Sequence, residues 1–100
     1  MTFHAKKLLT IVTESVLEAP LVKVLQQLGA HGYTVCDARG GGSHGVQGGG
    51  WSFEGNIRVD VVCDTAVAEA IAAHCQQAYL PHYGLILYVS DVGVLRADKF

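Results

Sequence analysis

Charge is the scarcest property of this sequence. Only 16% of its 100 residues are charged, against roughly a quarter in an average domain. Seven basic and nine acidic residues leave a net charge of −2, which excludes the strongly basic surface that holds a nucleic-acid backbone. The 50% apolar content excludes a disordered chain. With so few charged residues, a small domain would expose much apolar surface. We therefore expect part of that surface to be buried between subunits.

Long apolar runs and closely paired cysteines are also missing. No stretch approaches the roughly 20 apolar residues of a membrane span, and the run that begins at Leu8 is too short for a secretory signal. Cys36, Cys63 and Cys75 are an odd number and widely spaced, which is typical of reduced thiols and not of a disulfide framework or a zinc knuckle. We expect one cytoplasmic domain spanning residues 1–100.

Five segments predict strands. Residues 8–13 are apolar and rich in β-branched side chains, and residues 56–63 alternate apolar with polar side chains. Residues 33–38 and 85–89 give two further candidates, and residues 92–95 predict a short fifth strand.

The first predicted helix follows the first strand. Leucines recur at helical spacing after Pro20, and proline is tolerated only in the first turn of a helix. The helix should therefore begin within residues 17–19 and stop at Gly29. Ser15 and Glu18 have the spacing of a capping box, but that start would place the proline too deep in the helix.

The second predicted helix, residues 66–79, is rich in alanine, is capped by Asp64 or Thr65 and ends before Pro81. The element order is then that of an α+β, ferredoxin-like βαββαβ fold, with an antiparallel sheet and both helices on one face. The other face of the sheet carries apolar residues without a helix to cover them. A second copy of the chain is the simplest cover.

The glycines are concentrated between the second and third strands. Seven of the twelve lie in residues 40–50. They belong to the connection formed by residues 39–54, and a connection this long inside a small domain is usually functional. Gly40, Gly42 and Gly45 have the dinucleotide spacing G-x-G-x-x-G, but no helix follows to supply the dipole that binds pyrophosphate. Consecutive glycines can still direct several backbone N–H groups at one anion, and Ser43 and His44 would add donors.

Two aromatic residues stand at the end of this segment. Trp51 and Phe53 follow the last glycines, and a flexible spacer does not need exposed aromatic side chains. Such side chains are typical anchors on a partner surface. The segment is therefore predicted to bind a ligand or a partner.

No grouping of residues predicts catalysis or a metal site. The five histidines lack metal-ligand spacing such as H-x-x-x-H, and no Ser–His–Asp or Cys–His group follows from spacing. Cys36 and Cys63 fall in predicted strands, where a small buried hydrophobic residue is the usual role. Arg58 and Asp60 are predicted to lie on one polar strand face.

Four segments carry a family resemblance: KLLTIVTE (7–14), GAHGYTV (29–35), EGNIRVD (54–60) and YGLILYV (83–89). In order and spacing, the chain resembles the PII signalling family, within it the PII-like branch associated with bicarbonate transport and carboxysomes. The resemblance implies a homotrimer whose three sheets face a central axis. It also implies adenine-nucleotide sites in the clefts between neighbours, at the base of a long T-loop, here residues 40–54.

The resemblance also implies which residues surround the nucleotide. The phosphates would lie in a cradle formed by Gly40, Gly42, Ser43 and His44, with Gly84 closing over them. The adenine would contact Ile11, Val62 and Cys63. Across the subunit boundary the nucleotide would meet Gly32, Tyr33, Thr34 and Arg96. No metal ion and no catalytic residue is implied.

Several cations of the family pattern are absent here. Leu85 stands where ATP-binding members place a lysine, and Asp98 replaces a second basic residue of the tail. His44 and Gln47 replace T-loop arginines of the bicarbonate-transporter regulators. Because each added phosphate needs more positive charge, we expect ADP, AMP or cyclic AMP as ligand in preference to ATP. Residues 39–53 contain no tyrosine, so the uridylylation of nitrogen-sensing members is not expected.

Two classes of function remain open. A sensor would use the nucleotide to order the T-loop, whose Trp51 and Phe53 would dock on a partner such as a bicarbonate transporter or a carboxysome component, with bicarbonate as a candidate second signal. An enzyme, either a weak nucleotide hydrolase or another small ferredoxin-like trimer, would use His44 as general base. A trimer of the divalent-cation tolerance type would need metal ligands that the sequence does not show. The sensor is the favoured hypothesis.

Overall fold

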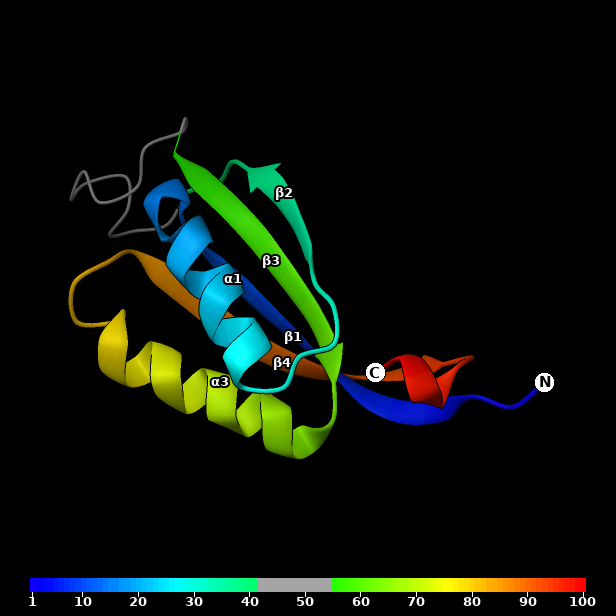
Figure 1. Cartoon of the computed structure of the whole chain (residues 1–100). Helices are drawn as coiled ribbons and strands as arrows, with labels where there is room; N and C mark the ends of the chain where they lie inside the picture. Colours follow the sequence, from blue (N-terminus) through cyan, green and yellow to red (C-terminus); the bar gives the residue numbers. More distant parts are fainter. Residues whose placement is uncertain (42–54) are drawn as a thin grey trace.

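The structure, a computed structural model, describes residues 1–41 and 55–100. Its elements are, in chain order, β1 (His4–Glu14), η1 (Ser15–Leu17), α1 (Glu18–Gln27), β2 (Thr34–Ala38), β3 (Asn56–Cys63), α3 (Thr65–Ala78), β4 (Leu85–Val94) and η2 (Ala97–Lys99). The strands form one antiparallel sheet in the order β2-β3-β1-β4. Both α-helices cover the same face of this sheet (Figure 1). The predicted ferredoxin-like fold is confirmed.

The helix ends follow the local sequence. α1 begins at Glu18, so that Pro20 lies in its first turn, and no side-chain hydrogen bond caps it. The start predicted from Pro20, within residues 17–19, is thus confirmed, and the earlier start that the capping-box spacing suggested is not. Gly29 ends the helix with a φ of +100°, a conformation that side chains other than glycine rarely adopt. Asp64 is the N-cap residue of α3, but its carboxylate binds Lys6 Nζ at 2.6 Å instead of a helix N–H.

The predicted fifth strand is wrong. Residues 92–94 continue β4, because β1 itself extends back to His4 and supplies pairing partners as far as Val94. Lys7 faces Asp91 across this pair and forms an ion pair with it, an arrangement that stabilises neighbouring strands. The extended parts of β1 and β4 form a two-stranded ribbon that projects from the body of the molecule, and both termini lie at this end (Figure 1).

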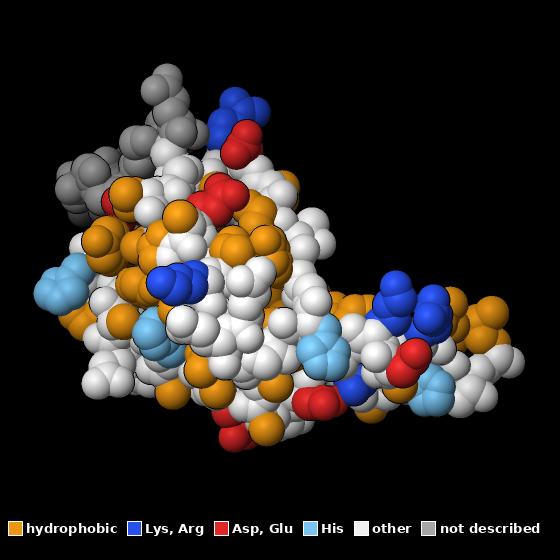
Figure 2. All heavy atoms as spheres, in the orientation of Figure 1, with side chains coloured by type: hydrophobic (Ala, Val, Ile, Leu, Met, Phe, Trp, Pro, Cys, Tyr) orange, Lys and Arg blue, Asp and Glu red, His pale blue; other side chains and the backbone are white. Residues whose placement is uncertain are grey.

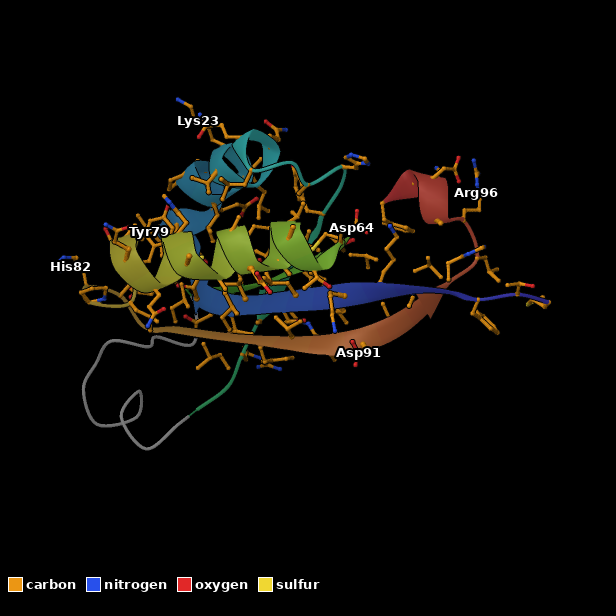
Figure 3. All side chains as sticks on the ribbon, turned by 90° about the horizontal axis from the view of Figure 1, so that it is seen from below. Lys23, Asp64, Tyr79, His82, Asp91 and Arg96 are labelled. Carbon is orange, nitrogen blue, oxygen red and sulfur yellow. The ribbon has the colours of Figure 1, made fainter. Side chains whose placement is uncertain are left out.

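The hydrophobic core lies between the sheet and the two helices. Alternation along the strands turns one set of side chains toward the helices. The largest fully buried members are Leu9 and Ile11 of β1, Ile57, Val59 and Val61 of β3, Leu21 and Leu25 of α1, and Ile71 and Cys75 of α3. Seen along the sheet, both helices stand on the same side of it (Figure 3).

The opposite face of the sheet, which we call the open face, is not covered by a described helix. Strand register and alternation place Val12, Ile86 and Tyr88 there, and Ile86 and Tyr88 are 52% and 46% exposed. Asp60 accepts hydrogen bonds from Thr10 Oγ1 at 2.7 Å and from Arg58 Nε at 3.1 Å. The predicted open face therefore exists, with an apolar strip along β4 beside this polar cluster.

The two strand cysteines differ in burial. Cys63 faces the core and is 1% exposed, and burial is the largest cause that raises the pKa of its thiol. The prediction for Cys36 is wrong, because this residue is exposed in the chain. It lies on β2, an edge strand, opposite Arg58 of the open face.

Candidate functional site

Gly84, the residue that precedes β4, is hydrogen-bonded to two side chains at the end of β1. Gly84 donates its backbone N–H to Glu14 Oε2 at 2.8 Å. Its carbonyl accepts a hydrogen bond from Thr13 Oγ1, also at 2.8 Å. This contact follows from the register, in which Thr13 pairs with Leu85. Both backbone polar groups of Gly84 are therefore fixed by side chains at the end of β1.

The two ends of the 42–54 segment come to the same place. Ala38, near the end of β2, pairs with Asn56, which also pairs with Glu14. Ser15 donates its backbone N–H to the carbonyl of Gly55. Gly40 follows two residues after the end of β2, and a Cβ added there would meet nothing within 4 Å. We call this region, comprising Glu14, Gly40, Gly55 and Gly84, the loop end of the sheet.

The loop end contains the described part of the predicted phosphate cradle. Gly40 and Gly84 both lie there, although 44 positions separate them in the sequence. The other predicted cradle residues, Gly42, Ser43 and His44, lie outside the described residues, as do the predicted partner anchors Trp51 and Phe53. Gly40 follows β2 and Gly84 precedes β4, the two edge strands of the sheet, so the two glycines share one end of the sheet but stand at its opposite edges, and the common cradle stays a prediction.

The predicted adenine residues do not form one pocket within the chain. Ile11 has no exposed surface and belongs to the core. Cys63 also faces the helices, whereas Val62 points to the open face because successive strand residues alternate. The side chain of Ile11 therefore has no surface with which to contact a ligand while the core is intact.

The residues predicted to act across a subunit boundary lie away from the loop end. Gly32 and Tyr33 precede β2, and Thr34 begins it, opposite Asp60. Tyr33 is 42% exposed, and a Cβ added at Gly32 would meet nothing within 4 Å. These residues are accessible to a second molecule.

Arg96 lies still farther from the loop end. It follows β4, whose ten residues span about 33 Å in extended conformation, whereas Gly84 precedes the same strand. Figure 3 shows Arg96 beside the projecting ribbon. Tyr79 and His82, which come shortly before Gly84 in the sequence, lie at the other end of the molecule. One chain therefore cannot bring Arg96 and Gly84 to the same ligand.

The charge around Arg96 is mixed. Its guanidinium lies 3.9 Å from the Asp98 carboxylate, and both side chains are largely exposed. Basic side chains gather on the projecting ribbon and on the tail beside it (Figure 2), and η2 lies against β1. An anionic ligand would have to compete with Asp98 for this guanidinium.

A groove of about 380 Å³ lies between α3 and the edge strand β4. Its lining is mostly apolar and includes Cys75, Leu80 and Ile86. Burial raises the pKa of the Cys75 thiol to about 11, so at neutral pH this thiol is protonated and a poor nucleophile. The sequence pattern did not predict this groove.

Residues 1–41 and 55–100 contain neither a candidate metal site nor a candidate membrane-spanning helix. No group of three or more His, Cys, Asp or Glu side chains in this part of the chain could hold a metal ion. None of the helices described there is long and apolar enough to cross a membrane.

Glu14 is the residue at this site that the sequence analysis missed. It lies 70 positions from its hydrogen-bond partner Gly84, and no local motif marks a carboxylate at the end of a strand. Only the adjacency of β1 and β4 in the sheet brings the pair together.

Comparisons with known proteins agree on one family. The family model of the nitrogen regulatory protein P-II matches residues 6–99. A Thermus thermophilus protein described as PII-like and signalling is 41% identical, over 99% of this chain and 98% of its own, with a TM-score of 0.82. CPII of Thiomonas intermedia K12, bound to ADP, AMP and acetate, is 20% identical, over 100% of this chain and 98% of its own, with a TM-score of 0.87. A second structure of that protein, bound to ADP and bicarbonate, has a TM-score of 0.84 at 20% identity, over 98% of this chain and 96% of its own.

Proposed function

Because the chain belongs to the nitrogen regulatory P-II family, we propose that it is a non-catalytic regulatory protein that binds adenine nucleotides between the subunits of a homotrimer. The observation that carries this proposal is the division of the predicted site into two groups. Gly40 and Gly84 lie at the loop end, and Arg96 lies beside the projecting ribbon, about one strand length away. A site that uses both groups would therefore need two chains.

The open face supports the proposed trimer. Ile86 and Tyr88 are about half exposed in the single chain, and their strip lies on the sheet face that lacks a described helix. If three such faces meet around an axis, this apolar surface is buried. The same assembly would bring a neighbour's residues, among them Tyr33 and Arg96, to the loop end.

The arrangement of charges supports a ligand with few phosphates. Leu85 follows Gly84 where a lysine would add a charge-assisted contact, and Arg96 already has a carboxylate neighbour in Asp98. We therefore propose ADP, AMP or cyclic AMP as ligand in preference to ATP. The ADP and AMP in the Thiomonas structure support this choice, and the bicarbonate in a second structure of that protein supports a small anion as further ligand.

Residues 40–54 would act as the T-loop. Their base joins Gly84 through Glu14 and Ser15, so a ligand that binds beside Gly84 would act on the point where this segment joins the sheet. Trp51 and Phe53 would then contact a partner protein of inorganic-carbon metabolism, for example a bicarbonate transporter or a carboxysome component. The nucleotide would favour one arrangement of the loop and so control this contact.

Calorimetric titration and thermal unfolding with ATP, ADP, AMP and cyclic AMP, each with and without bicarbonate, test the proposal. A ligand at a hundred times its Kd should raise the free energy of unfolding by about 2.7 kcal/mol. We expect the largest shifts with ADP, AMP or cyclic AMP, and a trimer mass in light scattering. If no adenine nucleotide binds, or if the protein is a monomer, the proposal is wrong. Hydrolysis that is abolished by His44→Ala would instead indicate an enzyme.

A further inference from the structure

We infer that Glu14 determines how many phosphates the proposed nucleotide site accepts, because its carboxylate occupies the backbone N–H of Gly84. The inference rests on the proposed function, in which Gly84 closes over the phosphates. It adds a residue to which neither the sequence pattern nor the family resemblance assigned a role.

The hydrogen bond has the geometry of a bound anion. Glu14 Oε2 lies 2.8 Å from the amide nitrogen of Gly84, a distance typical of a charged acceptor. A phosphate oxygen that approached the same amide would take the same position. The carboxylate of Glu14 therefore occupies the position that an oxygen of the nucleotide would take in the proposed cradle.

The rest of Gly84 is fixed, so the amide cannot simply turn toward a ligand. Its carbonyl is held by Thr13 Oγ1 at 2.8 Å, and Thr13 is fully buried. Leu85 continues directly into β4 and is 7% exposed. A phosphate can therefore take the Gly84 N–H only if the Glu14 side chain moves away.

The carboxylate also has a charge that no described cation offsets by a direct ion pair. The ion pairs found in residues 1–41 and 55–100 join Lys6 to Asp64, Lys7 to Asp91, Arg58 to Asp60, and Arg96 to Asp98. Even after it has moved, the side chain of Glu14 stays near Gly84, because the backbone of Glu14 is held in β1 opposite Asn56. Each additional phosphate then adds repulsion, which near a protein surface is stronger than in bulk water.

The consequence is selectivity by charge. AMP brings one phosphate to the cradle, ADP two and ATP three, so the repulsion by Glu14 grows along this series. Replacement of the carboxylate by a neutral group should therefore strengthen the binding of ATP more than that of ADP, and that of ADP more than that of AMP.

Calorimetric titration of AMP, ADP and ATP into the full-length chain and its Glu14→Gln variant tests this inference. Glutamine keeps the length and a carbonyl acceptor for the Gly84 N–H but removes the charge. We expect the ratio of the ATP Kd to the AMP Kd to fall about tenfold in the variant. Glu14→Ala, which removes the acceptor as well, should lower this ratio at least as far.

Glu18→Gln is the matched control, because it removes the same charge from an exposed position four residues later, at the start of α1. It should leave the ratio unchanged. If Glu14→Gln shifts all three affinities equally, or if Glu18→Gln has the same effect, the inference is wrong while the proposed function stands. If the parent chain binds none of the three nucleotides, the proposed function itself fails. Circular dichroism and a melting curve establish that each variant is folded.

Discussion

Thr13 and Gly84 are joined by a hydrogen bond across 71 positions of sequence, from the threonine hydroxyl to the glycine carbonyl at 2.8 Å. Thr13 has no exposed surface, so the loss of its hydroxyl would not be replaced readily by water. The bond fixes the turn between α3 and β4 to the end of β1. It therefore holds Gly84 in place for any ligand.

Thr13→Val should lower the free energy of unfolding by about 1 to 2 kcal/mol, because valine keeps the side-chain shape but leaves the Gly84 carbonyl without this donor. Urea denaturation measures the loss. Thr13→Ser keeps the hydroxyl and loses only a methyl group, at a cost of about 1 kcal/mol. In the serine variant nucleotide affinity should be retained, whereas in the valine variant it should fall. Equal affinities in both variants would show that this bond does not position the site.

Replacement by alanine should affect stability differently at the two glycines of the α1–β2 connection, Gly29 and Gly32. Gly29 has a φ of +100°, so Gly29→Ala should destabilise the chain by about 1 kcal/mol or more. Gly32 has open space around it, so Gly32→Ala should leave the free energy of unfolding unchanged. Under the proposed function, Gly32 contacts the nucleotide and Gly29 does not, so only Gly32→Ala should weaken nucleotide binding. A stable Gly32→Ala variant with undiminished affinity would remove Gly32 from the site.

The limits of β3 and the end of α1 could be predicted from the sequence, because local physics decides them. Residues 56–63 alternate apolar and polar side chains, and Gly29 readily adopts the positive φ that ends the helix. The ribbon could not be predicted in this way. Residues 4–7 precede the predicted first strand and belong to β1 because they pair with β4. The pattern of residues 92–95 predicted a strand but did not show that it continues β4.

The candidate site was predictable in its parts and not in its arrangement. The glycines at positions 40 and 84 could be named from the resemblance, but only the folded sheet shows that both stand at one end of it, beside its two opposite edge strands. The grouping of Ile11 with Val62 ignored that these residues lie on opposite faces, which the alternation of β3 and the register with β1 settle. Glu14 has no local signal, because its partner comes from the far end of the chain.

Ile86→Asp should dissociate the proposed trimer. Ile86 lies on the open face and is 52% exposed in the single chain, so a charge there would be buried without a partner when three sheets meet. Light scattering should then report a monomer or a strongly concentration-dependent mass. Ala73→Asp, on the exposed surface of α3, adds the same charge away from the sheet and should leave the trimer intact. A trimer that survives Ile86→Asp would place the interface elsewhere.

The stability of the chain should fall above pH 9 because of Cys75. Burial raises the pKa of this thiol from 9.0 to about 11, so the folded state keeps its proton while the unfolded state loses it. The stabilisation is complete below pH 9 and is lost as the pH rises through 11. Denaturation at pH 8 and pH 11 should show a loss of about 2 to 3 kcal/mol in the parent chain relative to Cys75→Ala. Cys63, whose pKa is also raised, is present in both proteins and cancels in the comparison.

The proposed sharing of a site between two chains can be tested by mixing two defective variants. Gly40→Asp places a carboxylate at the loop end, where an added Cβ meets nothing within 4 Å, and Arg96→Ala removes the cation beside the ribbon. Each variant alone should bind ADP weakly, because every site in it has one defective half.

In a trimer refolded from equal amounts of the two, the loop end of an Arg96→Ala chain can meet the ribbon of a Gly40→Asp chain. With random assembly, half of the loop ends and half of the ribbons are unchanged, so about a quarter of the subunit boundaries combine an unchanged loop end with an unchanged ribbon. Calorimetry should therefore find about that fraction of sites with parental affinity, since both halves of these sites are unchanged. Refolding either variant alone restores nothing and is the control. If the mixture binds no better than its components, then Gly40 and Arg96 do not serve one ligand from two chains, and the assignment of Arg96 to the site is wrong.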